Sequence, residues 1–177
     1  AWCKISFEGS YSNPLCYAHN LCLNGELVTE LVIPEGVTSI GDGAFYGCSG
    51  LTSITIPKSV AKIGKEAFKG CTGKLVVNCD IPSASSSGFG AFDSSKFIDV
   101  TIGEGVTSIG AYAFSDSHNL TSITIPESVT SVGYGAFEGC DKLTSITMPK
   151  RSVKLLKGAF GKESKILVNG KYKKIKY

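Results

Sequence analysis

Short segments in which apolar and polar residues alternate recur at a nearly fixed spacing along the chain. The pair Ala-Phe marks each recurrence, and successive pairs are 23, 24, 22, 23 and 23 residues apart. A period of this length is typical of solenoid proteins, in which each repeat is one structural unit that packs on the next. The pairs are Ala44-Phe45, Ala67-Phe68, Ala91-Phe92, Ala113-Phe114, Ala136-Phe137 and Ala159-Phe160.

The start of each repeat has the pattern of a short β-strand. In the segment LTSITI, residues 51–56, Ile54 and Ile56 share one face and Thr55 lies between them on the other. This follows because successive side chains of a strand point to opposite faces. Pro57 is expected to end the strand, since proline has no N–H to donate to a neighbouring strand. The pattern predicts one short strand per repeat, stacked in parallel.

Two further sides of each coil follow from the next residues. Val60 and Ile63 form a second apolar pair, and Gly64 suits a sharp turn or a positive φ. The segment GKEAFKGC, residues 64–71, has the small residues and the closing glycine of a single helical or 3₁₀ turn. Such a turn would direct Phe68 inward, and phenylalanine in register predicts a stacked spine.

Stacking of these coils at about 4.8 Å per step would make one continuous core. We place six repeats at residues 28–50, 51–74, 75–96, 97–119, 120–142 and 143–165. The third, 75–96, is irregular: its strand pattern survives, but the small polar residues 83–88 replace the Val and Ile layer. In the sixth, Arg151 appears as an insertion and Leu155-Leu156 replaces the Ile-Gly turn. The Ala-Phe register continues across both, so one domain is expected.

The ends of a solenoid expose its core and require caps. Residues 1–27 depart from the repeat and are aromatic, which predicts an N-terminal cap. Residues 166–177 have the pattern of two short strands on either side of Asn169-Gly170, a usual signal for a β-hairpin. We predict that this hairpin is the C-terminal cap. The aromatic residues near the N-terminus are Trp2, Phe7, Tyr11 and Tyr17.

The segments LTSITIP, residues 120–126, and VTSVGYGAFEGC, residues 129–140, resemble the BspA-like leucine-rich repeat family. The resemblance covers roughly residues 28–165, and LNGELVT, residues 23–29, is similar to the lead-in of members from gut Bacteroides. It implies a β-rich, right-handed leucine-rich-repeat solenoid with parallel strands. It also implies a cell-surface or secreted protein of a host-associated bacterium or a protist, with a role in adhesion and no catalytic residues.

Composition and charge narrow the class of partner. The chain has 177 residues and a net charge of +3, and four of its lysines lie in the last seven residues. Those lysines would either anchor an acidic polymer or charge the edge of a final strand, and alternation with Tyr172 and Ile175 favours the charged edge. No nucleic-acid partner is expected. No run of 18 apolar residues and no apolar signal-peptide core are present. Since the first residue is not Met, we expect a fragment or a mature product.

The seven cysteines include no C-x-x-C pair, so zinc-site spacing is absent. Cys48, Cys71 and Cys140 occupy the same position in three repeats, where a small side chain packs well in the interior, and we expect buried free thiols. Cys3, Cys16 and Cys22 are close in sequence and could form a disulfide, but the sequence fixes neither the pairing nor whether one forms.

The sequence contains no convincing catalytic or cofactor-binding motif. Asp116, Ser117 and His118 contain the residue types of a hydrolase triad, but they are nearly adjacent on one polar turn, whereas a triad needs a separately oriented base and an oxyanion site. His19 lies far away in sequence. The row of Glu35, Glu104 and Glu127 is interrupted by lysines at the same coil position, so no metal site is expected. We predict no enzyme and no cofactor.

Two surfaces remain as candidates for binding. The turns carry Tyr46, Tyr112 and Tyr134, and tyrosine is enriched in binding hot spots, although these rings could merely cover the phenylalanine spine. The strands carry a ladder of hydroxyls, which more often stabilises neighbouring strands than binds a ligand. The expected partner is a protein or glycoprotein on a host cell, in extracellular matrix or on another microbe. The alternative is a structural spacer that presents another domain. The strand residues are Thr52, Thr55, Thr121, Thr124, Thr144 and Thr147.

Overall fold

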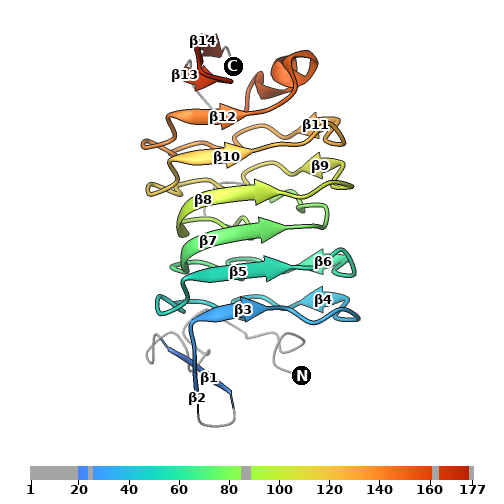
Figure 1. The fold of residues 1–177 in the computed structure, drawn as a ribbon, viewed down its shortest axis with the longest axis vertical. Helices are drawn as coiled ribbons and strands as arrows, with labels where there is room; N and C mark the ends of the chain where they lie inside the picture. The colour runs from blue at the N-terminus through green and yellow to red at the C-terminus, as the bar shows by residue number, and fades with distance from the viewer. Residues whose placement is uncertain (1–19, 24–25, 85–88, 161–163, 176–177) are drawn as a thin grey trace.

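A computed structural model of the chain describes residues 20–23, 26–84, 89–160 and 164–175, and these residues form one β-solenoid. The largest sheet has eight strands in the order β14-β13-β12-β10-β8-β7-β5-β3 (Figure 1). Six of them come from successive coils and pair in parallel, as the repeat pattern predicted. These six are β3 (Glu30–Val32), β5 (Ser53–Ile56), β7 (Thr72–Val77), β8 (Lys96–Ile102), β10 (Ser122–Thr124) and β12 (Ser145–Thr147).

The inward side chains of this sheet are apolar and lie in register. Ile54, for example, pairs with Leu31 of the preceding coil and Leu75 of the following one, and Ile54 and Leu75 are 1% exposed. Thr55, the next residue along β5, points to the opposite face and is half-buried. The prediction of one inward and one outward face is therefore confirmed.

The second side of the solenoid consists of two-residue strands in two small parallel sheets. β4 (Ser39–Ile40) pairs with β6 (Lys62–Ile63), and β9 (Ser108–Ile109) pairs with β11 (Ser131–Val132). Gly64 follows β6 because there is no room for a side chain: a Cβ there would clash with the backbone of Gly41 and Asp42 in the first coil. Close approach between coils, rather than a positive φ, explains this glycine.

The third side is built around the phenylalanine spine. Phe92 is fully buried, and its ring centroid lies 5.3 Å from that of Phe68 and 4.9 Å from that of Phe114, with both pairs stacked. The spine segments are isolated turns and not helices: Cys71 N–H donates to Phe68 O, while Phe68 N–H donates to Ala91 O of the next coil. The predicted turn is present, but its backbone bonds also join neighbouring coils.

The third coil differs from the prediction for it. Leu75 pairs with Ile54 of the second coil. Thr72, and not Leu75, therefore lies level with Leu51, the first residue of the second repeat. The Val and Ile layer is not lost to a polar loop: Cys79 and Ile81 are buried, and Ile81 forms a parallel bridge with Ile109. The hydrophobic pattern did not predict these two buried residues, because the third coil reaches the buried layer after fewer residues than the regular coils do. In the sixth coil the 3₁₀-helix η3 (Lys150–Leu156) replaces the second-side strand.

The carboxylate of Asp80 compensates for this shorter path. It accepts hydrogen bonds from Thr107 N–H at 2.6 Å, from the Thr107 hydroxyl at 2.8 Å and from Ser108 N–H at 3.1 Å. Partial burial acts to raise the pKa of Asp80, but these bonds outweigh it and lower that pKa below its ordinary value. The side chain takes the place of a backbone acceptor that a regular coil would supply.

An Asp80→Asn variant is expected to lose this stabilisation in a pH-dependent way. Because the folded pKa is lowered, the contribution is present above the unfolded pKa of about 3.9 and is lost as pH falls through the folded value. Urea midpoints should therefore differ between wild type and variant near neutral pH and converge at low pH. Glu35→Gln, an exposed carboxylate of the first coil, is the control. A difference that does not shrink in acid would contradict this role for Asp80.

Both ends of the described chain carry antiparallel hairpins. β1 (Leu21–Leu23) pairs with β2 (Glu26–Val28), and β13 (Ser164–Val168) pairs with β14 (Lys171–Ile175) around the Asn-Gly turn. Asn169 and Gly170 have φ values of 51° and 73°, as the predicted two-residue turn requires. β13 extends the large sheet in parallel from β12, and exposed Lys171 and Lys173 lie on the edge strand β14. Residues 1–19, to which most of the predicted N-terminal cap belongs, lie outside the described residues.

The cysteines of the repeat are buried free thiols, as predicted. Cys48, Cys71 and Cys140 are each no more than 8% exposed, and Cys71 Sγ donates to Phe45 O across the coil boundary at 3.0 Å. Burial raises the pKa of Cys140 to about 12 and that of Cys79 to about 11. Cys22 is exposed and free, while Cys3 and Cys16 lie outside the described residues.

Thiol labelling should follow this division. Because only the thiolate reacts, Cys22 is expected to be alkylated before the buried Cys48, Cys71, Cys79 and Cys140 in the native protein. Peptide mass spectrometry after a short pulse of iodoacetamide would measure the order, with a urea-unfolded sample as the control for intrinsic reactivity. Early labelling of Cys71 would contradict the packing described for it.

Candidate functional site

Asp116, Ser117 and His118 do not have the arrangement of a catalytic triad. The Ser117 hydroxyl is buried and donates to Phe92 O at 2.9 Å, so it faces the core. Nδ1 of the exposed His118 ring lies 2.8 Å from Gly139 O and 3.2 Å from Asp141 Oδ2. The ring is thus oriented by Gly139 and Asp141 of the next coil and not by Asp116. Across the described ranges, no group of three or more His, Cys, Asp or Glu side chains could hold a metal ion. His19 lies outside those ranges.

The strand-face threonines join one coil to the next. Thr52 Oγ1 donates to Thr29 O at 3.0 Å, and Thr121 Oγ1 donates to Ile98 O at 2.9 Å. Thr144 Oγ1 reaches Thr121 O at 3.5 Å. These hydroxyls supplement the backbone bonds between coils, which supports the structural interpretation of this ladder.

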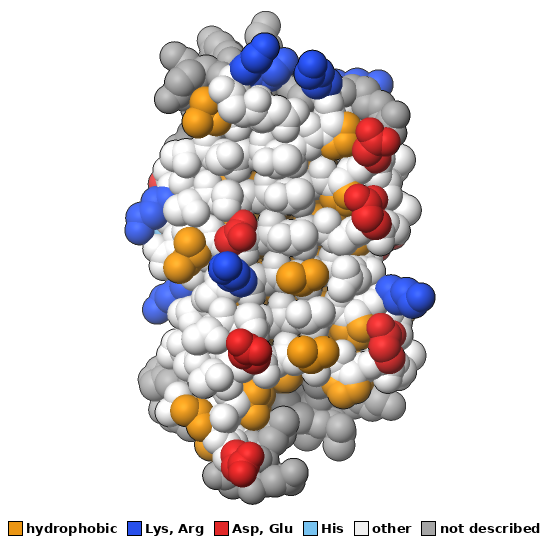
Figure 2. Space-filling view, in the orientation of Figure 1, with side chains coloured by type: hydrophobic (Ala, Val, Ile, Leu, Met, Phe, Trp, Pro, Cys, Tyr) orange, Lys and Arg blue, Asp and Glu red, His pale blue; other side chains and the backbone are white. Residues whose placement is uncertain are grey.

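The remaining threonines lie in a second outward column. Thr124 pairs in register with Thr101 and Thr147, and all three are exposed. Thr55 belongs to the same column of an earlier coil and is half-buried. Figure 2 shows this face as mostly small polar surface with single apolar side chains and with acidic groups along one border. The described hollows on the second side of the solenoid and beside η3 are lined by other residues.

Two of the three candidate tyrosines lie together on the turn side. The rings of Tyr112 and Tyr134 are 5.9 Å apart and nearly perpendicular, at 77°. Tyr134 is 53% exposed, whereas Tyr112 is half-buried over Gly135, where a Cβ would lie 2.5 Å from the Tyr112 ring. Tyr112 therefore supports Tyr134, which is the more accessible of the two.

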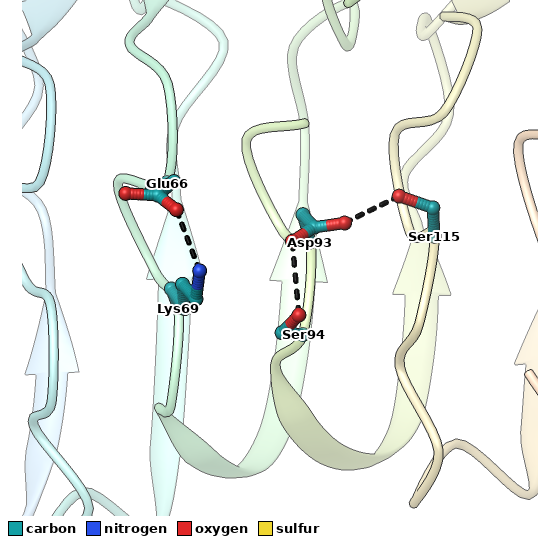
Figure 3. A network of polar contacts seen from close by, with 5 residues as sticks. All are labelled: Glu66, Lys69, Asp93, Ser94 and Ser115. Carbon is teal, nitrogen blue, oxygen red and sulfur yellow. Dashed lines mark hydrogen bonds and ion pairs between the residues drawn. The ribbon is translucent and has the colours of Figure 1, made fainter. Parts of the chain in front are cut away.

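Tyr46 lies apart, in a polar environment of its own. Its ring centroid is 5.9 Å from Lys69 Nζ, which also pairs with Glu66 at 2.6 Å (Figure 3). Burial acts to lower the pKa of Lys69, but the hydrogen bond and charge of Glu66 outweigh it and hold that pKa above its ordinary value. Tyr46 is half-buried, so it offers less contact area than Tyr134.

The turns of the third and fourth coils carry a second polar group. The carboxylate of Asp93 is buried and accepts hydrogen bonds from the Ser94 hydroxyl at 2.9 Å and from the Ser115 hydroxyl (Figure 3). Ser115 belongs to the next coil, so this network holds two turns together. It stabilises the segment that carries the Tyr112 ring.

Phe89 is an exposed aromatic residue that the sequence analysis missed. It is 49% exposed, and Lys65 Nζ lies 5.5 Å from its ring centroid. Phe89 stands two residues before the Ala of its Ala-Phe pair, as Tyr134 does in its own repeat. An alignment of the repeats on that pair identifies this position as the equivalent of Tyr134. We call Phe89, Tyr112 and Tyr134 the turn-edge aromatic surface.

Comparison with known protein families places these features in context. A family model described as "BspA type Leucine rich repeat region (6 copies)" matches residues 18–88 and 85–176. The chain belongs to the BspA-type leucine-rich repeat family. The resemblance inferred from the repeat motif is thereby confirmed, and repeat modules of this kind are generally protein-binding surfaces. No curated protein matches the chain.

One solved structure is similar to this BspA-type module. It is a leucine-rich repeat protein from Bacteroides ovatus, with 32% sequence identity over 68% of the present chain and a TM-score of 0.40. The match spans 40% of the length of that protein. Among the described residues of the present chain, no helix is long and apolar enough to cross a membrane.

Proposed function

We propose that this module is a non-enzymatic adhesion domain, secreted or held at a cell surface, that binds a protein or glycoprotein of a host or another microbe through the turn-edge aromatic surface. The observation that carries the proposal is the exposure of Phe89 and Tyr134 on the turn side of the solenoid. Tyrosine is enriched among the few residues that supply most of the energy at protein-binding interfaces. Lys65 beside Phe89 adds a cation at the rim.

A structural spacer is the second candidate. It is favoured by the continuous hydrogen bonding between coils, which makes the solenoid stiff along its axis. A spacer needs no exposed anchors, and substitution of its surface aromatics would leave its function unchanged. The two candidates therefore differ in what the turn edge does.

A binding assay of the immobilised module with purified extracellular-matrix proteins and mucin-type glycoproteins would distinguish the two candidates. We expect saturable binding to at least one, with a loss of about tenfold or more when Phe89, Tyr112 and Tyr134 are all replaced by Ala. Circular dichroism would verify that the triple variant folds. Binding that survives the triple substitution would reject the turn-edge aromatic surface as the binding site, and no binding to any protein would favour the spacer.

A further inference from the structure

The second coil places two of its own lysines against aromatic rings on the turn side of the solenoid. Lys69 Nζ lies 5.9 Å from the centroid of the Tyr46 ring and pairs with Glu66 at 2.6 Å (Figure 3). Lys65 Nζ lies 5.5 Å from the centroid of the Phe89 ring. An ammonium group is attracted by the negative face of an aromatic ring and by a carboxylate. Rings and carboxylates of this edge therefore already hold ammonium groups.

The fourth and fifth coils bring the same kinds of acceptor together. The rings of Tyr112 and Tyr134 are nearly perpendicular, with centroids 5.9 Å apart, and so form two adjacent walls. The Glu138 carboxylate stands beside them: the position of a Cβ on Gly135 would be 2.5 Å from Tyr112 Cε1 and 3.0 Å from Glu138 Oε2. Two aromatic rings and one carboxylate thus meet beside Gly135.

No lysine of the described residues completes this second arrangement. None of them places an ammonium over either tyrosine ring or forms an ion pair with Glu138. The position after the spine phenylalanine, which is Lys69 in the second coil, is Glu138 itself in the fifth. Lys157, one repeat after Tyr134, is exposed and makes neither contact. Tyr134 is 53% exposed and Glu138 is half-buried, so both can be reached from solvent.

The position from which the chain could supply an ammonium to Tyr134 is occupied by Ala111. Lys65 stands two residues before its Ala-Phe pair and covers Phe89, which has the same position in the following coil. Ala111 precedes Tyr134 in the same way, one coil earlier, but its side chain carries no charge. Tyr134 is therefore left without the lysine that covers Phe89.

The charges nearby favour a cation. Burial is the main cause of the high pKa of the Cys140 thiol, and the negative charges of Asp116 and Asp141 add to it. Cys140 follows Glu138 by two residues, so these carboxylates belong to the same pair of turns. A positively charged group that approaches Glu138 consequently meets further negative charge.

We propose that Tyr112, Tyr134 and Glu138 bind the side-chain ammonium of a lysine on the protein partner. The ammonium lies against the exposed Tyr134 ring and donates to the Glu138 carboxylate, while Tyr112 forms the second wall. This inference rests on the proposed function, because it specifies the group of the partner that meets the turn-edge aromatic surface. It adds Glu138 to that surface as a residue that determines specificity.

Titration with an acetylated, amidated Gly-Lys-Gly peptide, followed by ¹H–¹⁵N NMR at constant ionic strength, tests this site. The control peptide contains Nε-acetyl-lysine, which has the same backbone and no positive charge. We expect the amides of Tyr134, Gly135 and Glu138 to shift with saturation below about 100 mM lysine peptide, and binding at least about fivefold weaker for the acetylated peptide.

Matched variants locate the bound lysine. Ala111→Lys supplies the ammonium from the chain itself and should weaken peptide binding at least about fivefold, whereas the uncharged Ala111→Gln should preserve it. Glu138→Gln should weaken binding at least about threefold, while Glu35→Gln, which removes an exposed carboxylate of the first coil, should not. Equal binding of both peptides, binding that survives Glu138→Gln, or no saturable shift in the wild type would each overturn the proposal.

The lysine site and the adhesive function fail in distinguishable ways. Matrix-protein binding that is lost on triple substitution of Phe89, Tyr112 and Tyr134, but is unchanged in Glu138→Gln, would support the proposed function and overturn the lysine site. Saturable, charge-dependent peptide binding, combined with matrix-protein binding that survives the triple substitution, would support the lysine site and reject the turn edge as the adhesive surface.

Discussion

Replacement of Phe92 by Ala is expected to lower the free energy of unfolding by about 3–5 kcal/mol, the usual range for a buried aromatic residue. Phe92 is fully buried at the centre of the spine and contacts rings of the coils before and after it, as well as the edge of Phe97. Its removal opens a cavity that rings on both sides cannot fill by a small movement. Urea denaturation followed by circular dichroism would measure the change.

Phe92→Leu is the matched control, because it retains most of the apolar volume and should cost considerably less. Ile98→Ser reports on an exposed apolar side chain, 55% accessible, and should change stability by about 0.5 kcal/mol or less. An Ala variant that is as stable as the Leu variant would show that the spine is not the main contact between coils.

Gly133→Ala is expected to lower the free energy of unfolding by about 1–3 kcal/mol. Gly133 needs no unusual φ, but a Cβ there would clash with the backbone of Gly110 and Ala111 in the preceding coil. The two coils would have to separate, which weakens the bond from Gly133 N–H to Ile109 O. Thermal unfolding of the variant would show the loss.

Gly36→Ala separates steric approach from backbone strain. Gly36 has a φ of +90°, yet nothing lies within 4 Å of the position a Cβ would take. Its substitution should cost only the strain of a positive φ, about 1–2 kcal/mol. If Gly36→Ala lowers stability more than Gly133→Ala does, close contact between coils is not the reason for glycine at residue 133.

Most of the fold could be predicted because the same sequence pattern occurs in several successive repeats. Ile54 and Thr55 show the alternation of one strand, and the same pattern in other coils confirms that the strands stack in parallel. The Ala-Phe pair fixes the register of the spine for the same reason. Asn169-Gly170 identified the C-terminal hairpin through local turn chemistry alone.

The third coil could not be predicted because its compensation is made by a side chain. Asp80 replaces a backbone acceptor, and Cys79 and Ile81 reach the buried layer after fewer residues than usual. A prediction based on residue spacing therefore places the Val and Ile layer in the serine-rich residues 83–88. Hydrogen bonds between residues far apart in sequence decide such a case, and hydrophobic periodicity does not contain them.

The candidate site was only partly accessible from sequence. Tyrosines could be noticed by residue type, but their exposure depends on neighbours in other coils: Tyr112 lies over Gly135, Tyr46 lies beside Lys69, and Tyr134 projects. Phe89 was missed because phenylalanine in this chain is usually buried. The proposed function depends on binding at this turn edge.

The affinity of a Phe89→Ser/Tyr134→Ser double variant for a matrix protein or glycoprotein bound by the wild type tests that proposal most directly. Ile98→Ser, which removes an exposed apolar side chain from the strand face, is the comparison. We predict that the double variant binds at least about tenfold more weakly and that Ile98→Ser binds as the wild type does. Unchanged affinity of the double variant, or a loss confined to Ile98→Ser, would contradict the account.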